Sequence, residues 1–127
     1  MLLNLANSAL RTGLARLPNA ERAIIDTEKL RGYVLSPAHP LGRFKAAFFR
    51  RLGYSAENWE AFEERLKEMI LSRDATMVEE SQYGQKFVVE GTLPVTGGET
   101  VQIVTVWVIL KEENVPRFVT AYPGGLP

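Results

Sequence analysis

The spacing of the apolar residues changes near residue 75, and this change constrains the fold more than any other feature of the sequence. Before it, apolar residues recur every three or four positions, as in helices. After it, alternating segments rich in β-branched and aromatic residues predict four strands, at Thr76–Ser81, Gln85–Leu93, Val101–Lys111 and Phe118–Tyr122. The links between them are too short for crossover helices. The sequence therefore predicts an α+β fold, with N-terminal helices packed on one face of a four-stranded antiparallel β-meander.

Four helices are expected before the strands. The first would end before Pro18, the second begin at Asp26 or Thr27, the third span Leu41–Leu52, and the fourth span Glu57–Ser72 after a cap at Ser55. We accordingly divide the chain into an N-terminal helical extension, residues 1–17, and a single α+β domain, residues 18–127. The first helix would carry an apolar stripe, which either the core or a second copy of the chain would cover. A homodimer through this helix is therefore one expected partnership.

The composition excludes several classes of site. The 127 residues include no cysteine and one histidine, so disulfides, thiolate zinc sites and a cysteine nucleophile are ruled out. We expect no metal and no cofactor. The N-terminus lacks the continuous apolar core of a signal peptide, and no segment approaches the ~20 apolar residues of a membrane span. The sequence therefore predicts a cytoplasmic protein that does not bind membranes.

The charge is unevenly distributed along the chain. Residues 1–54 carry nine lysines and arginines against three acidic residues, whereas residues 55–127 carry six against twelve. One interpretation is that the basic half binds an anionic partner. The other is that the two halves attract each other within the fold.

The chemistry-bearing residues concentrate in Ser36–Arg51, around His39. This histidine lies between two prolines, just before the third expected helix. Lys45 follows within that helix, and Arg43 and Arg50 are seven residues apart, so they share a helix face. Because a helix N-terminus offers unpaired N–H groups and a positive dipole end, the segment predicts a phosphate-binding site. The alternative is a structural histidine beside a proline turn.

The last expected strand carries a second set of polar side chains. Strict alternation would place Arg117, Val119 and Ala121 on one face and Phe118, Thr120 and Tyr122 on the other. Thr120 and Tyr122 would then act together as hydroxyl donors. The alternative is an ordinary terminal strand built from good β-formers.

These segments resemble an uncharacterised bacterial domain family. The resemblance covers roughly residues 17–123 and is carried by LPNAE, KLxxYxLSPxHPxGRxKAxxF, YGQKF and PRxVTAYP, of which HPxGxxKAxxF is the most specific. The layout of helices before a four-stranded sheet is similar to that of metal-independent ribonuclease toxins related to barnase, EndoU, colicin-type nucleases and RelE. The second resemblance is one of fold and pattern.

The resemblance to ribonuclease toxins implies a function and a set of roles. The chain would be a toxin or effector domain that binds RNA and cleaves it by attack of the ribose 2′-OH on the adjacent phosphorus, and a cognate inhibitor protein would be a further partner. His39 would be the acid or base, Lys45 would join it, and Thr120 and Tyr122 would be hydroxyl partners across a cleft. The phosphate contacts would be Arg43, Arg50 and Arg117.

A single histidine leaves the second proton-transfer role open, with Glu79, Glu90, Tyr122 and Lys45 as candidates. Enzymatic activity is therefore left open as well. The main alternative is a non-enzymatic protein-interaction module, such as a partner in a toxin system or an adaptor. A third interpretation is a small-molecule binder with an apolar pocket lined by Trp59, Phe87 and Trp107.

Overall fold

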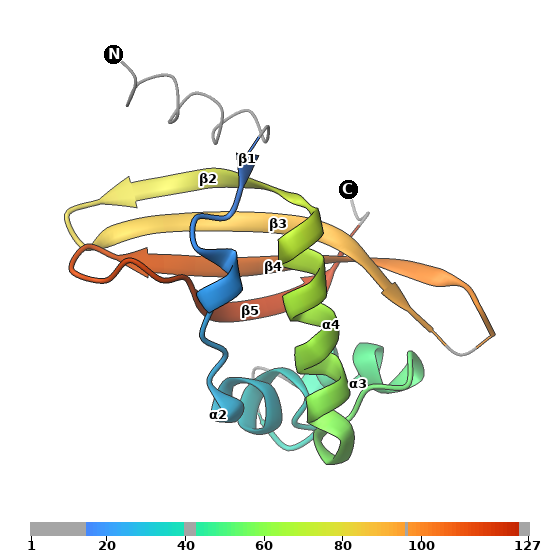
Figure 1. Cartoon of the computed structure of the whole chain (residues 1–127). Helices are drawn as coiled ribbons and strands as arrows, with labels where there is room; N and C mark the ends of the chain where they lie inside the picture. The colour runs from blue at the N-terminus through green and yellow to red at the C-terminus, as the bar shows by residue number, and fades with distance from the viewer. Residues whose placement is uncertain (1–14, 40–42, 96, 125–127) are drawn as a thin grey trace.

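A five-stranded antiparallel sheet forms the centre of the molecule, in the order β1-β2-β3-β4-β5 (Figure 1). The computed structural model describes residues 15–39, 43–95 and 97–124. The strands are β1 (Ala15–Arg16), β2 (Asp74–Ser81), β3 (Gly84–Pro94), β4 (Thr100–Leu110) and β5 (Arg117–Pro123). The four longer strands follow the predicted segments to within two residues at each end, so the antiparallel meander is confirmed.

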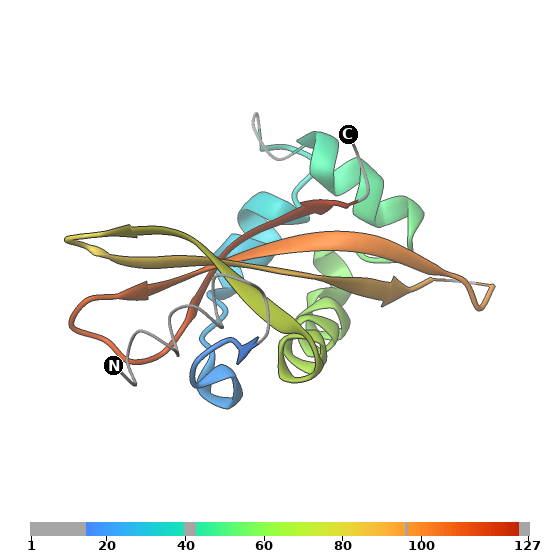
Figure 2. The ribbon, with the colours of Figure 1, turned by 90° about the horizontal axis from the view of Figure 1, so that it is seen from above.

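Among the described residues, three α-helices accompany the sheet: α2 (Thr27–Lys29), α3 (Arg43–Arg51) and α4 (Trp59–Ser72). Helix α2 continues into a π-helical segment, η2 (Leu30–Val34), and single 3₁₀ turns occur at η1 (Ala20–Arg22) and η3 (Ala56–Asn58). Helix α4 lies across one face of the sheet, whereas α2 and α3 lie beyond the β5 edge (Figure 1). Figure 2 shows α3 and α4 on opposite sides of the strands. The expected packing of all helices on one face therefore does not describe α3.

The hydrophobic core lies between α4 and the sheet. Alternate residues of β3 and β4 point into it, and Phe87 and Trp107 are fully buried in the same core as Phe62 of α4. The one buried polar side chain of the described core, Thr105, donates to the Val89 carbonyl and accepts from the Trp107 indole, both at 2.8 Å. Because Phe87 and Trp107 are packed in this core, they do not line the apolar pocket that the small-molecule interpretation requires.

Both predicted caps make capping contacts, but only the second helix begins where it is predicted; Ser55 caps η3, and α4 begins at Trp59, two residues later than expected. Asp26 is the N-cap of α2, where its carboxylate accepts from the Glu28 N–H at 2.8 Å. Before α4, the Ser55 N–H donates to the Asn58 side-chain oxygen at 2.7 Å, so Asn58 takes the place that glutamate usually occupies in a capping box. No helix in the described part of the chain is long and apolar enough to cross a membrane.

The prediction of four strands is wrong, because Ala15 and Arg16 pair with Ala75 and Asp74 of β2 as a fifth. The sequence pattern places these two residues at the end of the first helix instead. The next residue, Leu17, is 2% exposed and belongs to the core. Residues 1–14, which would form the rest of the predicted helix and its apolar stripe, lie outside the described residues.

A β-bulge changes the predicted alternation along β5. Thr120 pairs with Val106 and Phe118 pairs with Trp107, so Val119 is an extra residue in this strand. Phe118 and Ala121 are consequently both buried in the core. The expectation that Phe118 shares a face with Thr120 is therefore wrong.

Candidate functional site

The Lys45 ammonium lies within hydrogen-bond distance of two hydroxyl groups, one from η2 and one from β5. Its Nζ donates to Thr120 Oγ1 of β5 at 3.0 Å and to the Tyr33 hydroxyl of η2 at 3.3 Å. Lys45 is half-buried. Three residues that are far apart in the sequence, Tyr33, Lys45 and Thr120, thus meet at one positive charge.

Aromatic rings surround the same ammonium. Its Nζ lies 5.2 Å from the centroid of the Tyr33 ring and 5.9 Å from that of Tyr122, within the range of cation–π attraction. The His39 ring packs edge-on against Tyr33, with their centroids 4.8 Å apart. Tyr33 therefore touches both the only histidine and the lysine, and it connects the loop before α3 to the strand opposite.

The local structure explains why these side chains converge. On α3, Ala46 and Phe49 are buried, and the Phe49 ring contacts Phe62 of α4 at a centroid distance of 4.9 Å. This anchors α3 and aims the adjacent Lys45 at β5. The bulge at Val119 offsets the register of β5, so that Thr120 faces Lys45 while Phe118 remains in the core.

A cavity of about 510 Å³ adjoins this group of residues. It is lined by residues of α2, η2, the loop before α3 and β5: Asp26, Glu28, Lys29, Tyr33, His39, Val119 and Thr120. Tyr33 and Thr120, the two hydroxyl partners of Lys45, thus form part of its wall. The cavity and the ammonium together make one continuous candidate site.

The recorded contacts of the Lys45 ammonium leave its charge available to an anion. Within the described part of the chain, every recorded partner of this ammonium is uncharged: two hydroxyl groups and two aromatic rings. Hydroxyl groups orient an ammonium but do not neutralise it, so an anionic ligand can still pair with the charge. No group of three or more potential metal ligands occurs among the residues described.

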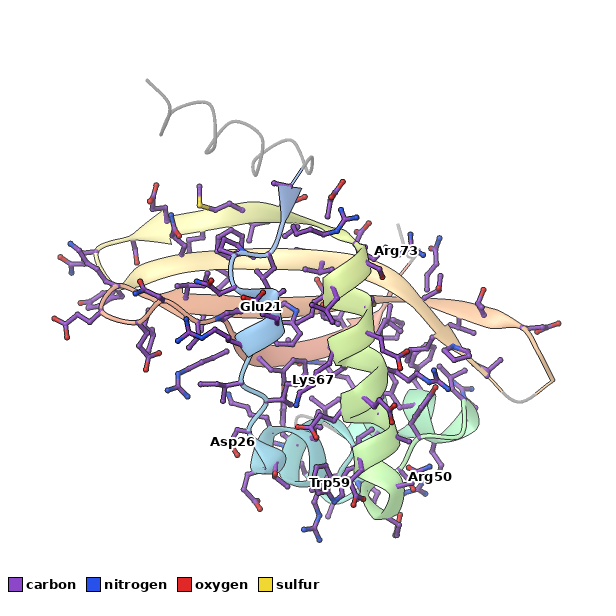
Figure 3. All side chains as sticks on the ribbon, in the orientation of Figure 1. Glu21, Asp26, Arg50, Trp59, Lys67 and Arg73 are labelled. Carbon is purple, nitrogen blue, oxygen red and sulfur yellow. The ribbon has the colours of Figure 1, made fainter. Side chains whose placement is uncertain are left out.

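The three predicted phosphate contacts differ in their surroundings. Arg43 begins α3, but its side chain lies outside the described part of the structure. Arg50 is exposed beside the lower end of α4, and Asp26 of the cavity lies on the other side of that helix (Figure 3). Arg117 makes a two-pronged ion pair with Glu113, at 2.7 and 2.8 Å. That pairing raises the pKa of Arg117 and lowers the pKa of Glu113.

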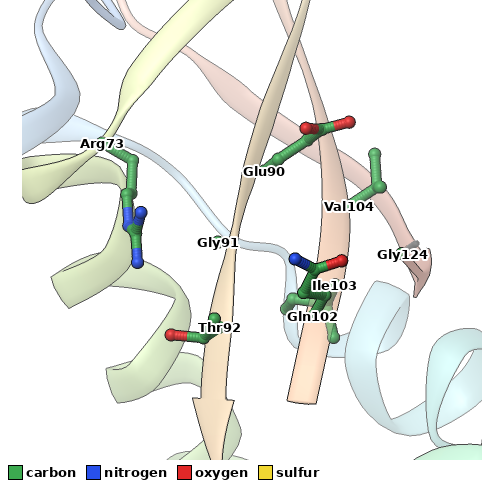
Figure 4. A pocket seen from close by; sticks show the side chains of 8 residues that line it. All are labelled: Arg73, Glu90, Gly91, Thr92, Gln102, Ile103, Val104 and Gly124. Carbon is green, nitrogen blue, oxygen red and sulfur yellow. The ribbon is translucent and has the colours of Figure 1, made fainter. Parts of the chain in front are cut away.

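Two of the four candidates for the second proton carrier lie elsewhere. Glu79 is 3.6 Å from Lys86 on the β2–β3 hairpin. Glu90 lines a different cavity, of about 220 Å³, where it lies on the other side of β3 from Arg73 (Figure 4). Neither borders the His39 cavity. Tyr122 and Lys45, in contrast, are within 6 Å of each other as ring centroid and ammonium.

Sequence reasoning assigns no functional role to Tyr33, Asp26 or Glu28. The apolar pattern of the second helix places Tyr33 in the core, and Asp26 is expected only as a helix cap. The available signal is proximity in sequence, since Tyr33 precedes His39 by six residues within the same segment, KLxxYxLSPxHP. A spacing of six that includes a proline does not define a distance in space, so the pairing of these rings is not predictable from the sequence.

The comparisons with known proteins can now be placed beside this geometry. Residues 16–125 match the model of DUF6883, a domain of unknown function. The chain belongs to that family. This confirms the resemblance to an uncharacterised domain family and extends its range by one residue at the N-terminal side and two at the C-terminal side. No curated protein matches the sequence.

One similar solved structure is a chain from a "Contact-dependent growth inhibition toxin - immunity protein complex from Klebsiella pneumoniae 342". The TM-score is 0.60 at 21% sequence identity, and the match covers 79% of the present chain and 98% of the other. At this identity the likeness concerns the fold alone. The DUF6883 domain thus shares its architecture with one component of a toxin–immunity pair.

Proposed function

We propose that this DUF6883 domain is a metal-independent ribonuclease that serves as the toxin or effector part of a bacterial toxin system. The observation that carries the proposal is the meeting of His39, Tyr33 and Lys45 with Thr120 at the β5 edge. A proton carrier beside a cation whose recorded partners are uncharged suits the cleavage of a phosphodiester, which needs proton transfer and stabilisation of negative charge. The toxin-system setting rests on the fold shared with a chain of the growth-inhibition complex.

The proposed reaction requires two proton transfers and one charge stabiliser. A base takes the proton of the ribose 2′-OH, whose oxygen attacks the adjacent phosphorus. The bond from phosphorus to the 5′ oxygen of the next nucleotide breaks, and an acid protonates that oxygen. The products are a 2′,3′-cyclic phosphate and a free 5′-hydroxyl. Lys45 would bind the non-bridging oxygens, on which charge increases in the transition state.

The roles of the remaining residues follow from their contacts with Lys45 and His39. Thr120 and Tyr33 would hold the ammonium in position, and Tyr33 would also orient the His39 ring. His39 would serve as the acid or the base. Tyr122, whose ring lies beside Lys45, would supply the second proton-transfer group.

The proposed partners are RNA and a cognate inhibitor protein. Such an inhibitor would protect the producing cell, and the similar complex likewise pairs a toxin with an immunity protein. Action on cellular RNA would require a cytoplasmic location at the time of attack. A homodimer through residues 1–17 stays a separate proposal, because residues 1–14 lie outside the structural description.

The test is cleavage of a mixed-sequence single-stranded RNA by the purified full chain in excess EDTA. We expect His39→Ala and Lys45→Ala each to lower the cleavage rate by about 100-fold or more. The control is Lys67→Ala, which removes an exposed lysine of α4 and should leave the rate unchanged. The products should carry 2′,3′-cyclic phosphates, and the same sequence as DNA should stay intact. Induced expression should slow growth for the wild type and not for the two site variants.

The alternative is a non-enzymatic member of a toxin system, and one observation favours keeping it in the test. The similar complex contains both a toxin and an immunity protein, and either could have this fold. A folded wild-type protein that leaves every RNA intact and does not slow growth would overturn the nuclease. Relief of a co-expressed toxin by that protein would then support the immunity role.

A further inference from the structure

The cavity beside Lys45 has aromatic, apolar and acidic side chains in its walls. Its aromatic wall is formed by Tyr33 and His39, and an apolar patch comes from Val119, which the bulge of β5 displaces from the regular alternation. Asp26 and Glu28, from the start of α2, add two carboxylates to the lining. A volume of about 510 Å³ is in the range of small-molecule ligand pockets.

A cavity with aromatic and apolar walls and carboxylates at its edge suits a nucleobase, which has flat faces and a polar edge. Bases of single-stranded RNA are commonly bound by packing against aromatic side chains and by hydrogen bonds to their edges. Because Tyr33 and Thr120 belong both to this cavity and to the Lys45 cradle, a nucleotide with its phosphate at Lys45 would direct its base into the cavity. The cavity is therefore placed to select the base beside the scissile phosphate.

Of the two carboxylates, that of Glu28 is the better placed to read a base. Asp26 is already used, since it caps α2 and lies close enough to Arg117 to raise the pKa of that guanidinium further. The Glu28 side chain lies over the following turn, where its Oε2 is 2.9 Å from the position that a Cβ on Gly32 would occupy. Among the residues that the structure describes, no ion pair of this carboxylate is recorded.

A carboxylate discriminates between bases by their hydrogen-bond donors. Ionised Glu28 is an acceptor only. Guanine presents two adjacent donors, N1–H and the N2 amino group, which match the two carboxylate oxygens. Adenine and cytosine each set an acceptor beside their amino donor, and uracil sets a carbonyl on each side of its single N–H. Guanine therefore gains a paired contact, whereas each of the other three bases would place an acceptor atom, a ring nitrogen or a carbonyl oxygen, against one carboxylate oxygen.

We infer that this cavity is a guanine-binding subsite, read by Glu28 between the Tyr33–His39 wall and Val119. The inference rests on the proposed function, because it assigns the base next to the phosphate that Lys45 would hold. It predicts that RNA is cut beside guanosine. It also predicts a binding preference that exists without catalysis.

The test is titration of the full chain with guanosine, inosine, adenosine, cytidine and uridine 3′-monophosphates, followed by NMR. We expect the guanosine nucleotide to bind about tenfold more tightly than those of adenosine, cytidine and uridine. Inosine, which lacks the N2 amino group, should be intermediate. Glu28→Gln should remove most of the guanosine preference while leaving uridine binding unchanged, because the phosphate contact persists. Glu60→Gln, at an exposed position of α4, is the matched control.

A second variant protects the test from misfolding. Gly32→Ala does not change Glu28 itself. It would shift the Glu28 carboxylate, since the new Cβ would lie 2.9 Å from Oε2. Alanine suits a helical position better than glycine, so the fold should persist. We expect Gly32→Ala to lower guanosine binding in the same direction as Glu28→Gln.

The failures of the two proposals are distinguishable. Cleavage after all four bases at similar rates, with equal binding of the nucleotides, would overturn the guanine subsite and leave the nuclease standing. A guanosine preference that depends on Glu28, in a protein that cuts no RNA, would overturn the nuclease and leave a guanine-nucleotide site. Unchanged guanosine binding in both Glu28→Gln and Gly32→Ala would also overturn the subsite.

Discussion

At the scale of single residues, the candidate site depends on how one ammonium is held. Lys45 has two hydroxyl acceptors, and one of them belongs to the tyrosine whose ring contacts His39. A hydrogen bond to a charged group contributes about 1.5–3 kcal/mol when it is well formed. The two hydroxyl groups should therefore matter to activity even though neither exchanges a proton in the proposed reaction.

We predict that Tyr33→Phe and Thr120→Val each lower RNA cleavage by about tenfold, because each removes one hydrogen bond to Lys45. Tyr33→Leu should lower it further, since it also removes the ring that orients His39. Steady-state cleavage rates measure these effects. Tyr83→Phe, at a side chain that is 72% exposed, is the control. Equal rates for Tyr33→Phe and Tyr33→Leu would show that the ring does not orient the histidine.

At the scale of elements, the contact of α4 with β3 depends on a glycine. A Cβ at Gly91 would lie 2.2 Å from Sδ and 2.4 Å from Cγ of Met69 on α4. The missing side chain thus lets the helix pack closely on the strand. Met69 is 5% exposed and has little room to move away.

Gly91→Ala should therefore lower the free energy of unfolding by about 1–3 kcal/mol through overpacking. In a Met69→Ala background the same change should cost much less, because the clashing atoms are gone. Urea denaturation of the wild type, both single variants and the double variant gives the coupling energy directly. Additive effects of the two substitutions would contradict the proposed contact.

A second element-scale feature is the loop that joins β4 to β5, where Glu113 accepts two hydrogen bonds from Arg117. Hydrogen bonding to Arg117 is the main cause that lowers the pKa of Glu113 below its ordinary value of 4.5. Because the carboxyl has the lower pKa in the folded protein, the pair stabilises the fold above the unfolded pKa. That contribution is lost as the pH falls through the folded pKa.

Glu113→Gln should accordingly destabilise the protein at pH 7 and have a diminishing effect below pH 4.5. The measurement is the difference in unfolding free energy between wild type and variant across this pH range. Glu112→Gln, at an exposed neighbour in the same loop, serves as the control. A difference that is constant with pH would show that the ion pair does not stabilise the loop.

At the scale of the whole molecule, the hydrophobic core extends to Leu17, the residue that follows β1. β1 pairs with β2, and Leu17 is 2% exposed and belongs to the same core as α4 and η1. Leu17→Ala should cost about 2–5 kcal/mol of unfolding free energy, as expected for a leucine removed from a packed core. Leu71→Ala, at a position of α4 that is 54% exposed, should cost far less. Equal costs, measured by chemical denaturation, would place Leu17 in a separate extension.

Much of the fold is predictable because it depends on local patterns. Alternation indicates the bounds of β2 to β5, and the short connections require antiparallel pairing. The caps at Asp26 and Ser55 are contacts between neighbours in the sequence, so the residue types alone indicate them. β1 escapes such prediction because two residues provide no periodicity, and their strand conformation comes only from pairing with Ala75 and Asp74.

What the sequence determined by itself was the α+β class and a set of candidates that includes His39, Lys45, Thr120 and Tyr122. Tertiary structure alone decided that Tyr33 joins the histidine to the lysine and that Glu90 lies at another cavity. It also decided, through the bulge at Val119, that Thr120 faces Lys45 while Phe118 is buried. The physical reason is that periodicity reports how one segment meets its surroundings. The distance between side chains of three segments depends on the packing of α3 and η2 against β5, which no segment encodes alone.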